Sequence, residues 1–381
     1  MSRFFLFVLV IYGGMHVYAF LRARSAFQFG AAAGVAIAAF MLLMVFSLFF
    51  VRSLERHDYE LLARVFAYGA YVWMGVLSLF FCASLVFDLA GVAVRAAGWL
   101  ARSDVSAFLP SAKTAFWASL GLSLATCVYG YGEALSIRTE RLTIETTKLP
   151  AGIDRLTIAQ ISDVHLGLII RRGRLENIMN IVKAANPDIL VSTGDLVDAQ
   201  INHLTGLAER LREVQPRFGK YAITGNHEYY AGVDKAVAFT EKAGFTVLRD
   251  EAVTDGPITI VGMNDRTGAQ LRLEEPVSEK DLLAKLPRDK FILLMKHQPR
   301  IDEETLGLFD LQISGHTHKG QIFPFTLVVR LRFPAIAGDY DLGRGSRLHV
   351  SRGTGTWGPP IRFLAPPEVT LIDLVRKGVS S

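Results

Sequence analysis

The chain has 381 residues, of which 51% are hydrophobic and 20% charged, and its formal net charge is +5. Two cysteines and 25 phenylalanines exclude a disulfide scaffold and a disordered chain. The positive charge lies mainly in residues 1–150, with 12 Lys/Arg against 8 Asp/Glu, whereas residues 151–381 contain 29 against 28. The balanced C-terminal part gives no indication of a nucleic-acid-binding face, so we expect no nucleic-acid partner.

Residues 1–136 contain four stretches without a charged side chain, and these predict a membrane domain with four transmembrane helices. The stretches cover about 4–21, 27–51, 65–87 and 114–132. A helix needs roughly 20 apolar residues to cross the hydrocarbon core. A buried bundle in a soluble protein is the alternative, but its helices normally carry a polar stripe, and these stretches are apolar all round. The first stretch is expected to be retained, because it differs from a signal peptide in being followed by three more spans.

The basic residues around these stretches predict how the chain is oriented in the membrane. Four spans place both termini on one side of the bilayer. That side collects seven basic residues and the opposite loops collect five: Arg3, Arg52, Arg56, Arg64, Arg138, Arg141 and Lys148 against Arg22, Arg24, Arg95, Arg102 and Lys113. Because basic loops stay on the cytoplasmic side, we expect a multi-pass protein of the cell membrane with residues 137–381 in the cytoplasm.

Residues 137–381 have the pattern of an α/β domain, in which short apolar runs predict buried strands. The runs are Arg155–Ser162, Ile189–Thr193, Tyr221–Thr224, Thr259–Gly262, Phe291–Met295, Leu311–Ser314, Arg347–Ser351 and Val369–Leu374. Helical patterns lie between several of them, for instance Arg174–Ala185 and Asp234–Ala243. We therefore expect a two-sheet β-sandwich flanked by helices.

Polar side chains end the first three of these runs. Asp163 and His165 follow the first run, Asp195 the second, and Asn226 and His227 the third. Asp163 to Asp195 is 32 residues and Asp195 to Asn226 is 31, which is close to the roughly 30 residues of one strand–helix–strand unit. The three clusters should lie at the carboxyl ends of neighbouring parallel strands, where open α/β sheets bind ligands.

Two later apolar runs end in histidines, His297 and the pair His316 and His318. Carboxylate, amide and imidazole ligands together suit Mn, Fe or Zn, with Mg also open. Seven such ligands exceed one tetrahedral site and fit two divalent ions that share a carboxylate. Taken singly, an aspartate after a strand is usually a helix cap and a histidine a surface or core residue, but five clusters in series favour a metal site.

The whole series resembles the five motifs of the calcineurin-like metallophosphoesterase superfamily. The motifs read Asp163-x-His165, Gly194-Asp195-x-x-Asp198, Gly225-Asn226-His227-Glu228, His297 and Gly315-His316-x-His318. The multi-span first half and the stretches around the motifs resemble its membrane-associated bacterial branch of predicted phosphohydrolases and the transmembrane proteins with a metallophosphoesterase domain.

This resemblance implies a role for each residue of the series. One ion would be held by Asp163, His165, Asp195 and His318, and a second by Asp195, Asn226, His297 and His316, with Asp195 bridging. His227 matches the catalytic histidine near the phosphate, and Asp198 a residue beside the ligands.

We therefore expect a membrane-anchored, metal-dependent phosphoesterase that hydrolyses a phosphate ester or pyrophosphate with metal-activated water. The residues do not separate phosphatase from phosphodiesterase activity, and the membrane half favours a lipid-linked substrate. The alternative is a non-catalytic or regulatory module of this fold attached to a membrane sensor or transporter. It predicts degraded ligands or polar groups inside the spans, and the sequence shows a complete ligand set and nearly featureless spans. The sequence leaves the oligomeric state open.

Overall fold

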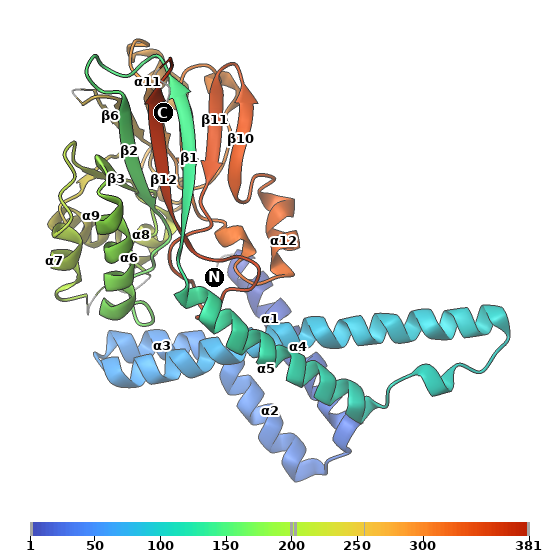
Figure 1. The fold of residues 1–381 in the computed structure, drawn as a ribbon. Helices are drawn as coiled ribbons and strands as arrows, with labels where there is room; N and C mark the ends of the chain where they lie inside the picture. The colour runs from blue at the N-terminus through green and yellow to red at the C-terminus, as the bar shows by residue number, and fades with distance from the viewer. Residues whose placement is uncertain (1–2, 199–200, 202–203, 255, 379–381) are drawn as a thin grey trace. The chain divides into compact units, whose positions relative to one another are not determined.

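The structure, a computed structural model, describes residues 3–198, 201, 204–254 and 256–378 (Figure 1). It divides into two compact units. The N-terminal unit comprises Met1–Gly132 with the short segment Gly358–Ile361, and the C-terminal unit comprises Glu133–Trp357 with Arg362–Ser381.

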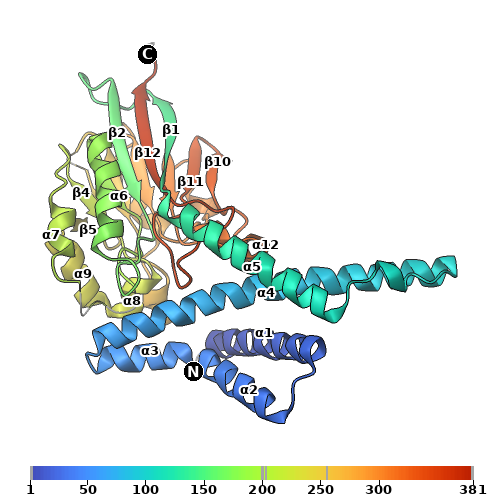
Figure 2. The ribbon, with the colours of Figure 1, turned by 60° about the horizontal axis from the view of Figure 1, so that its bottom comes forward.

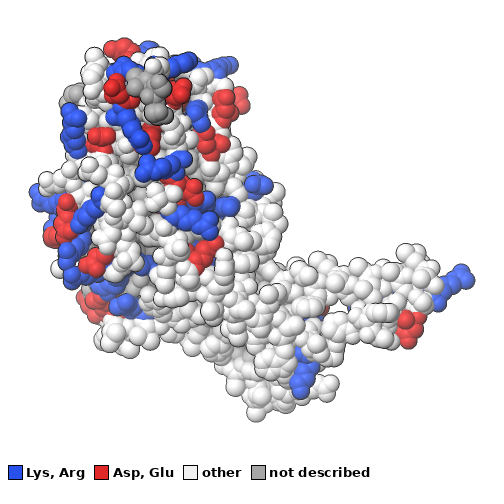
Figure 3. All heavy atoms as spheres, viewed as in Figure 1, with Lys and Arg blue, Asp and Glu red and all other residues white. Residues whose placement is uncertain are grey.

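Helices make up the N-terminal unit. They are α1 (Arg3–Phe27), α2 (Ala31–Val45), α3 (Ser47–Arg56), α4 (Glu60–Ala101), the 3-10 helix η1 (Ser106–Phe108) and α5 (Ala112–Leu135), which runs on into the C-terminal unit. Figure 3 shows few charged side chains on the visible face of these helices. One charge within these helices is paired: the carboxylate of Asp88 on α4 accepts hydrogen bonds from Arg22 Nη1 (2.7 Å) and Tyr18 OH (2.5 Å) on α1.

Among the described residues, only α4 is long and apolar enough to cross a membrane, and a second span results if α2 and α3 are counted together. The predicted stretch 27–51 is not a single helix, because α2 and α3 are bent by 55° at Phe46. Phe46 leaves the helical conformation (φ −95°, ψ 7°), and an apolar composition contains no signal for such a bend. The four-span arrangement therefore stays a prediction.

The C-terminal unit contains two six-stranded sheets, which confirms the predicted α/β domain with two sheets. The first sheet has the order β1 (Arg138–Thr146), β12 (Glu368–Arg376), β2 (Arg155–Ile161), β3 (Ile189–Ser192), β4 (Lys220–Ala222) and β5 (Thr246–Val247). The second has the order β10 (Gly338–Gly343), β11 (Ser346–Val350), β9 (Leu311–Ser314), β8 (Ile292–Met295), β7 (Thr259–Gly262) and β6 (Glu251–Val253). Within each sheet four neighbouring strands are parallel: β2 to β5 in the first, and β7, β8, β9 and β11 in the second.

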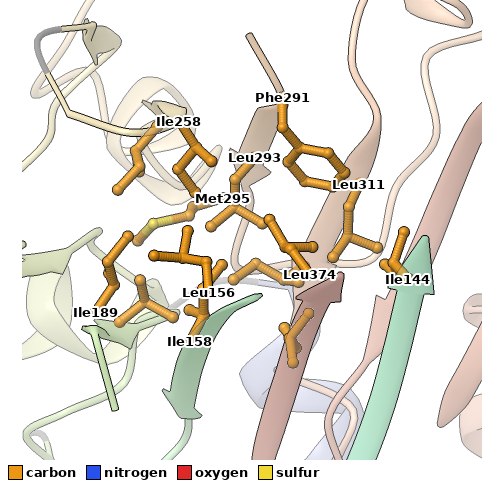
Figure 4. Packing of buried hydrophobic residues seen from close by; sticks show 14 of the residues in the cluster. Ile144, Leu156, Ile158, Ile189, Ile258, Phe291, Leu293, Met295, Leu311 and Leu374 are labelled. Atoms are coloured by element: carbon orange, nitrogen blue, oxygen red, sulfur yellow. The ribbon is translucent and has the colours of Figure 1, made fainter. Parts of the chain in front are cut away.

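Apolar side chains from both sheets form one core, in which Leu156 and Ile158 of β2 meet Leu293 and Met295 of β8 (Figure 4). The alternate residues of β8 belong to a second cluster on the outer face of the second sheet, where they pack against Leu283 of α11 (Glu279–Ala284). Since successive side chains of a strand point to opposite faces, a strand that is apolar at every position is buried on both faces. The continuous apolar runs of the sequence follow from this arrangement.

Helices connect the parallel strands and cover the outer faces of the sheets; α6 and α7 lie along the first sheet in Figure 2. The remaining elements are α6 (Arg172–Ala185), α7 (Leu207–Arg212), α8 (Asn226–Ala231), α9 (Val233–Lys242), α10 (Thr267–Gln270), α12 (Phe325–Arg332), and the 3-10 helices η2 (Glu303–Thr305) and η3 (His318–Gly320). Helix α6 ends at Asn186, which adopts the left-handed conformation (φ 43°) before Pro187. This helix end lets the chain turn at once into β3, the next parallel strand.

The strand β12, although far along the chain, lies second from the edge of the first sheet, between β1 and β2. The buried carboxylate of Asp373 on β12 accepts hydrogen bonds from Arg141 Nη1 on β1 (3.1 Å), and from Arg155 Nη2 (2.6 Å) and Thr157 Oγ1 (2.8 Å) on β2. Burial raises the pKa of Asp373, but these partners lower it by more, so the net pKa lies below the ordinary aspartate value. One carboxylate thus joins three strands.

Replacement of this carboxylate tests its contribution to stability. Because the folded pKa is depressed, the stabilisation is present above the ordinary aspartate pKa of about 4 and is lost as the pH falls through the folded value. Asp373→Asn should therefore lower the melting temperature of the full chain at pH 7, and the difference from wild type should shrink below about pH 4. The matched control is Asp154→Asn. The Asp154 carboxylate is 67% exposed and forms an ion pair with Arg376, so this variant should change the melting temperature little. Equal effects of the two variants, or a difference unchanged at low pH, would contradict this role.

Candidate metal centre

The predicted site residues lie just beyond the carboxyl ends of β2, β3, β4, β8 and β9. Five of them have a positive φ between 48° and 70°: Asp163, His165, Asp195, His316 and His318. A left-handed conformation is unfavourable for residues other than glycine and is concentrated at functional sites. The backbone therefore bends sharply at each of these positions, and the bend is held by the surrounding structure.

Two glycines make room for these bends. Gly194 has φ 92°, and a Cβ added there would lie 2.7 Å from the backbone nitrogen of Gly225 and from His297 Nδ1. At Gly315 a Cβ would overlap Ser162 Oγ and Asp163 Oδ2. Each glycine precedes a predicted ligand, so a larger residue would push a ligand out of the cluster.

A first group of ligand atoms is formed by Asp163, His165 and His318, whose side chains are all buried. These three atoms lie within 4.8 Å of one another. Nε2 of His318 is 3.1 Å from Nε2 of His165 and 3.4 Å from Oδ1 of Asp163. The three groups thus point toward one small volume.

A second group is formed by Asp195, His297 and His316, again with ligand atoms within 4.8 Å of one another. Nε2 of His297 is 3.2 Å from Asp195 Oδ2, 3.2 Å from Asn226 Oδ1 and 3.1 Å from His316 Nδ1. Asp195 also faces the first group, because its Oδ2 is 3.9 Å from His165 Nε2. The structure therefore brings together all the predicted ligands, with Asp195 between the two groups.

The protonation of His297 shows that the second group suits a cation. Nδ1 of His297 is 2.8 Å from the carbonyl oxygen of Thr193, so this nitrogen carries the hydrogen and donates it. In a neutral ring, Nε2 then turns its lone pair toward the oxygens of Asp195 and Asn226. Such an arrangement is repulsive unless a proton or a metal ion lies among these atoms. Accordingly, although burial lowers the pKa of His297, Asp195 raises it well above the ordinary value.

The imidazoles of His165, His316 and His318 are neutral and therefore available as ligands. Burial, together with a smaller effect of neighbouring histidines, lowers the pKa of His165 to about 3 and that of His316 to about 4. The pKa of His318 is also lowered well below the ordinary value by burial and by Arg362. Neutral imidazoles beside carboxylates are the donor set that divalent Mn, Fe or Zn ions bind, so the residues fit the predicted metals.

His227 lies beside the first group and has a different electrostatic character. Its Nδ1 is 2.9 Å from Asp198 Oδ1, and its ring centroid is 4.6 Å from that of His165. Burial lowers its pKa, but Asp195 and Asp198 raise it to about 9, so the ring is protonated at neutral pH. His227, His165 and Asp195 also form a third group whose atoms could hold a metal ion. Protonation and the bond to Asp198 make His227 a poorer ligand than its neighbours.

Glu228, which follows His227, holds the loops that carry the predicted ligands. Its buried carboxylate accepts hydrogen bonds from the backbone N–H groups of Asp195 (2.9 Å), Val197 (3.2 Å) and Gly225 (2.7 Å). Burial raises its pKa to about 7, with a further contribution from Asp195. Glu228 thus ties the loop after β3 to the start of α8. Taken alone, Glu228 looks in the sequence like an ordinary helix residue. Only its position beside Asn226 and His227 indicates that it belongs to the site.

Arg362 is a second supporting residue, and nothing in the sequence pattern singled it out. Its side chain is fully buried and donates to the carbonyl oxygens of Arg352 (2.7 Å), Gly355 (3.1 Å) and His318 (3.1 Å). Nη2 is also 3.0 Å from His318 Nδ1. Burial lowers the pKa of this guanidinium to about 9. One arginine therefore joins the loop after β11 to His318. His318 belongs to the candidate metal-binding cluster, which comprises the predicted ligands Asp163, His165, Asp195, Asn226, His297, His316 and His318.

Removal of this guanidinium should cost considerable stability. Each buried carbonyl left without a donor costs about 1–3 kcal/mol, so Arg362→Met should lower the free energy of unfolding by more than about 3 kcal/mol. Arg362→Lys should lie between it and wild type, because an ammonium reaches fewer of these carbonyls. Thermal unfolding of the full chain measures both. The control is Arg172→Met, which removes a side chain that is 67% exposed. A loss of stability in Arg362→Met no larger than in this control would contradict a stabilising role of Arg362.

Two facing sheets whose parallel strands end in groups of carboxylates and imidazoles, with one shared carboxylate, define an α/β metal-binding protein. A family model for the calcineurin-like phosphoesterases matches residues 156–320. An uncharacterized metallophosphoesterase of Aquifex aeolicus is 41% identical over 253 residues, which cover 66% of this chain and 96% of that protein. The chain therefore belongs to the calcineurin-like metallophosphoesterase family, and the resemblance of its motifs is confirmed.

Two further relatives extend this comparison. A transmembrane protein with metallophosphoesterase domain from Danio rerio is 32% identical over 269 residues, covering 67% of this chain and 62% of that protein. An uncharacterized metallophosphoesterase of Helicobacter pylori is 33% identical over 268 residues, covering 68% of this chain and 70% of that protein. The chain thus spans less than two thirds of the length of the fish relative.

Proposed function

We propose that the chain hydrolyses a phosphoester with the help of two divalent metal ions. Asp163, His165, Asp195 and His318 would hold one ion, and Asp195, Asn226, His297 and His316 the other. The observation that carries this proposal is the position of Asp195, whose carboxylate faces both groups of ligands. When bound, such ions supply an activated water and positive charge that offsets the charge of the phosphoryl oxygens.

The chain's own residues account for orientation and proton transfer. The backbone N–H of His227 donates to Asp195 Oδ1 (2.8 Å) and fixes the shared carboxylate. Because Nδ1 of His227 is bonded to Asp198, its Nε2 is the nitrogen that donates a proton to a phosphoryl oxygen or a leaving group. His227 is therefore the proposed catalytic residue, and Asp198 orients its ring.

We further propose that the substrate is lipid-linked and that the protein is anchored in the cell membrane with the C-terminal unit in the cytoplasm. Support comes from α4, from the name of the fish relative and from α12. On α12, Leu327, Val328 and Leu331 are 57%, 62% and 88% exposed. The next residue after α12, Phe333, contacts His316 with ring centroids 5.1 Å apart. An exposed apolar helix beside the metal-binding cluster is a place for the hydrocarbon part of a substrate.

Two substitutions separate metal binding from chemistry. Asp195→Asn removes the shared carboxylate and should abolish both turnover and most of the bound metal, which wild type should hold at about two ions per chain. His227→Ala should keep the metal but lower turnover by about 100-fold or more. Metal analysis, with hydrolysis of p-nitrophenyl phosphate and bis-p-nitrophenyl phosphate by the full chain in detergent, measures both. Loss of metal in His227→Ala would make this residue a ligand, and normal turnover would exclude it from catalysis.

The lipid preference is tested with matched substrates and one matched pair of variants. The full chain should hydrolyse lipid phosphates in mixed micelles faster than soluble nucleotides. Leu331→Gln should reduce the rate on the lipid severalfold by making the helix polar, whereas Leu271→Gln, at a residue that is also exposed (49%) but lies outside α12, should not. Equal rates on lipid and soluble substrates in wild type would remove this preference.

A further inference from the structure

Three arginines beside the second ligand group carry positive charge without a carboxylate partner. They are Arg266, Arg300 and Arg332, and within the described part of the chain none of them forms an ion pair. The pKa of the Arg300 guanidinium is lowered first by burial and then by the charges of Arg332 and Arg266. The three guanidinium groups are therefore close enough to interact. Like charges close to one another repel, and an anion bound among them would relieve this repulsion.

Phe333 places Arg300 and Arg332 next to the metal-binding cluster. The guanidinium carbon of Arg300 is 5.3 Å from the centroid of the Phe333 ring, and that ring is 5.1 Å from the ring of His316. Arg332 is the last residue of α12 and directly precedes Phe333. Helix α12 is itself fixed to the cluster, since Thr326 Oγ1 donates to the carbonyl oxygen of Lys319 (2.8 Å). The aromatic ring therefore contacts both a predicted ligand and the guanidinium of Arg300.

A hydrogen-bonded chain brings the loop of Arg266 to the same place. Arg300 Nε donates to Gln298 Oε1 (3.1 Å), and Gln298 Nε2 donates to Asp265 Oδ2 (2.9 Å). Asp265 also accepts from the backbone N–H of Thr267 (2.9 Å), which shapes the loop that contains Arg266. Asp265 supplies one negative charge to three positive ones and already binds two donors. The cluster thus keeps excess positive charge.

We propose that Arg266, Arg300 and Arg332, with Phe333, form a subsite for a second anionic group of the substrate. A planar guanidinium matches the oxygens of a phosphate or carboxylate, and three of them suit a doubly charged group. The substrate class is then a phosphoester that carries a further phosphate or carboxylate, with its reacting phosphate at the metal-binding cluster. This inference rests on the proposed function, because it takes that cluster as the place of the reacting phosphate.

Binding of simple phosphates to the full, manganese-loaded chain in detergent tests the subsite. Calorimetry compares alkanediyl bisphosphates of increasing linker length with the corresponding alkyl monophosphates. For at least one linker length the bisphosphate should bind about tenfold more tightly or better, as expected for added charge-assisted hydrogen bonds. In Arg300→Gln this ratio should fall to within about twofold, and Arg300→Lys should keep part of it.

Arg330→Gln is the matched control, because it removes the same charge from an exposed position of α12 two residues before Arg332. It should keep the ratio of the wild type. Affinities that do not differ between bisphosphate and monophosphate at any linker length would overturn the subsite. So would an equal loss in Arg330→Gln and Arg300→Gln, which would indicate a general positive field. Melting temperature and metal content of each variant exclude misfolding as the cause.

The same samples separate this inference from the proposed function through their hydrolysis of p-nitrophenyl phosphate and bis-p-nitrophenyl phosphate. Turnover without a preference for bisphosphates would leave the phosphoesterase proposal standing and overturn the subsite. A bisphosphate preference that depends on Arg300, without turnover of any phosphoester, would support the anion subsite and contradict hydrolysis.

Discussion

Holding several lone pairs within hydrogen-bonding distance of one another in a dry interior is unfavourable, and the C-terminal unit is built around this constraint. Oxygens of Asp195 and Asn226 and a nitrogen of His316 surround Nε2 of His297 at 3.1 to 3.2 Å. Buried polar groups without a donor cost free energy unless a proton or a cation lies among them. Where neither a proton nor a cation is present, the surrounding structure must hold these side chains in place against their mutual repulsion.

Rigid backbone connections provide this support. The carboxylate of Glu228 binds three backbone N–H groups from two of the motif loops, and Arg362 binds the carbonyls of the loop after β11 and of His318. Neither side chain is a predicted ligand of a metal ion. Their hydrogen bonds instead fix loops whose left-handed residues would otherwise relax. The support of the cluster thus comes from parts of the chain that are far apart in sequence.

The sequence predicts the cluster better than it predicts this support. Asp163, Asp195 and Asn226 recur at the length of one strand–helix–strand unit, so their meeting follows from the parallel order of the strands. Arg362 has no such spacing, because its partners are defined only once the loops have folded. The same holds for the bend at Phe46 and for β1, whose charged residues gave no strand signal, since each depends on packing rather than on composition.

The position of β12 between β1 and β2 also sets an order of events during synthesis. In the first sheet β1 pairs only with β12, although the two strands are separated by more than two hundred residues. A ribosome therefore completes α5 and β1 long before the partner of β1 exists, and the edge of that strand stays unpaired while the rest of the domain is made. The first sheet can close only after the final strand has left the ribosome. A chain that stops short of Glu368 lacks the strand that joins β1 to β2, so even a late premature stop leaves the sheet in two pieces.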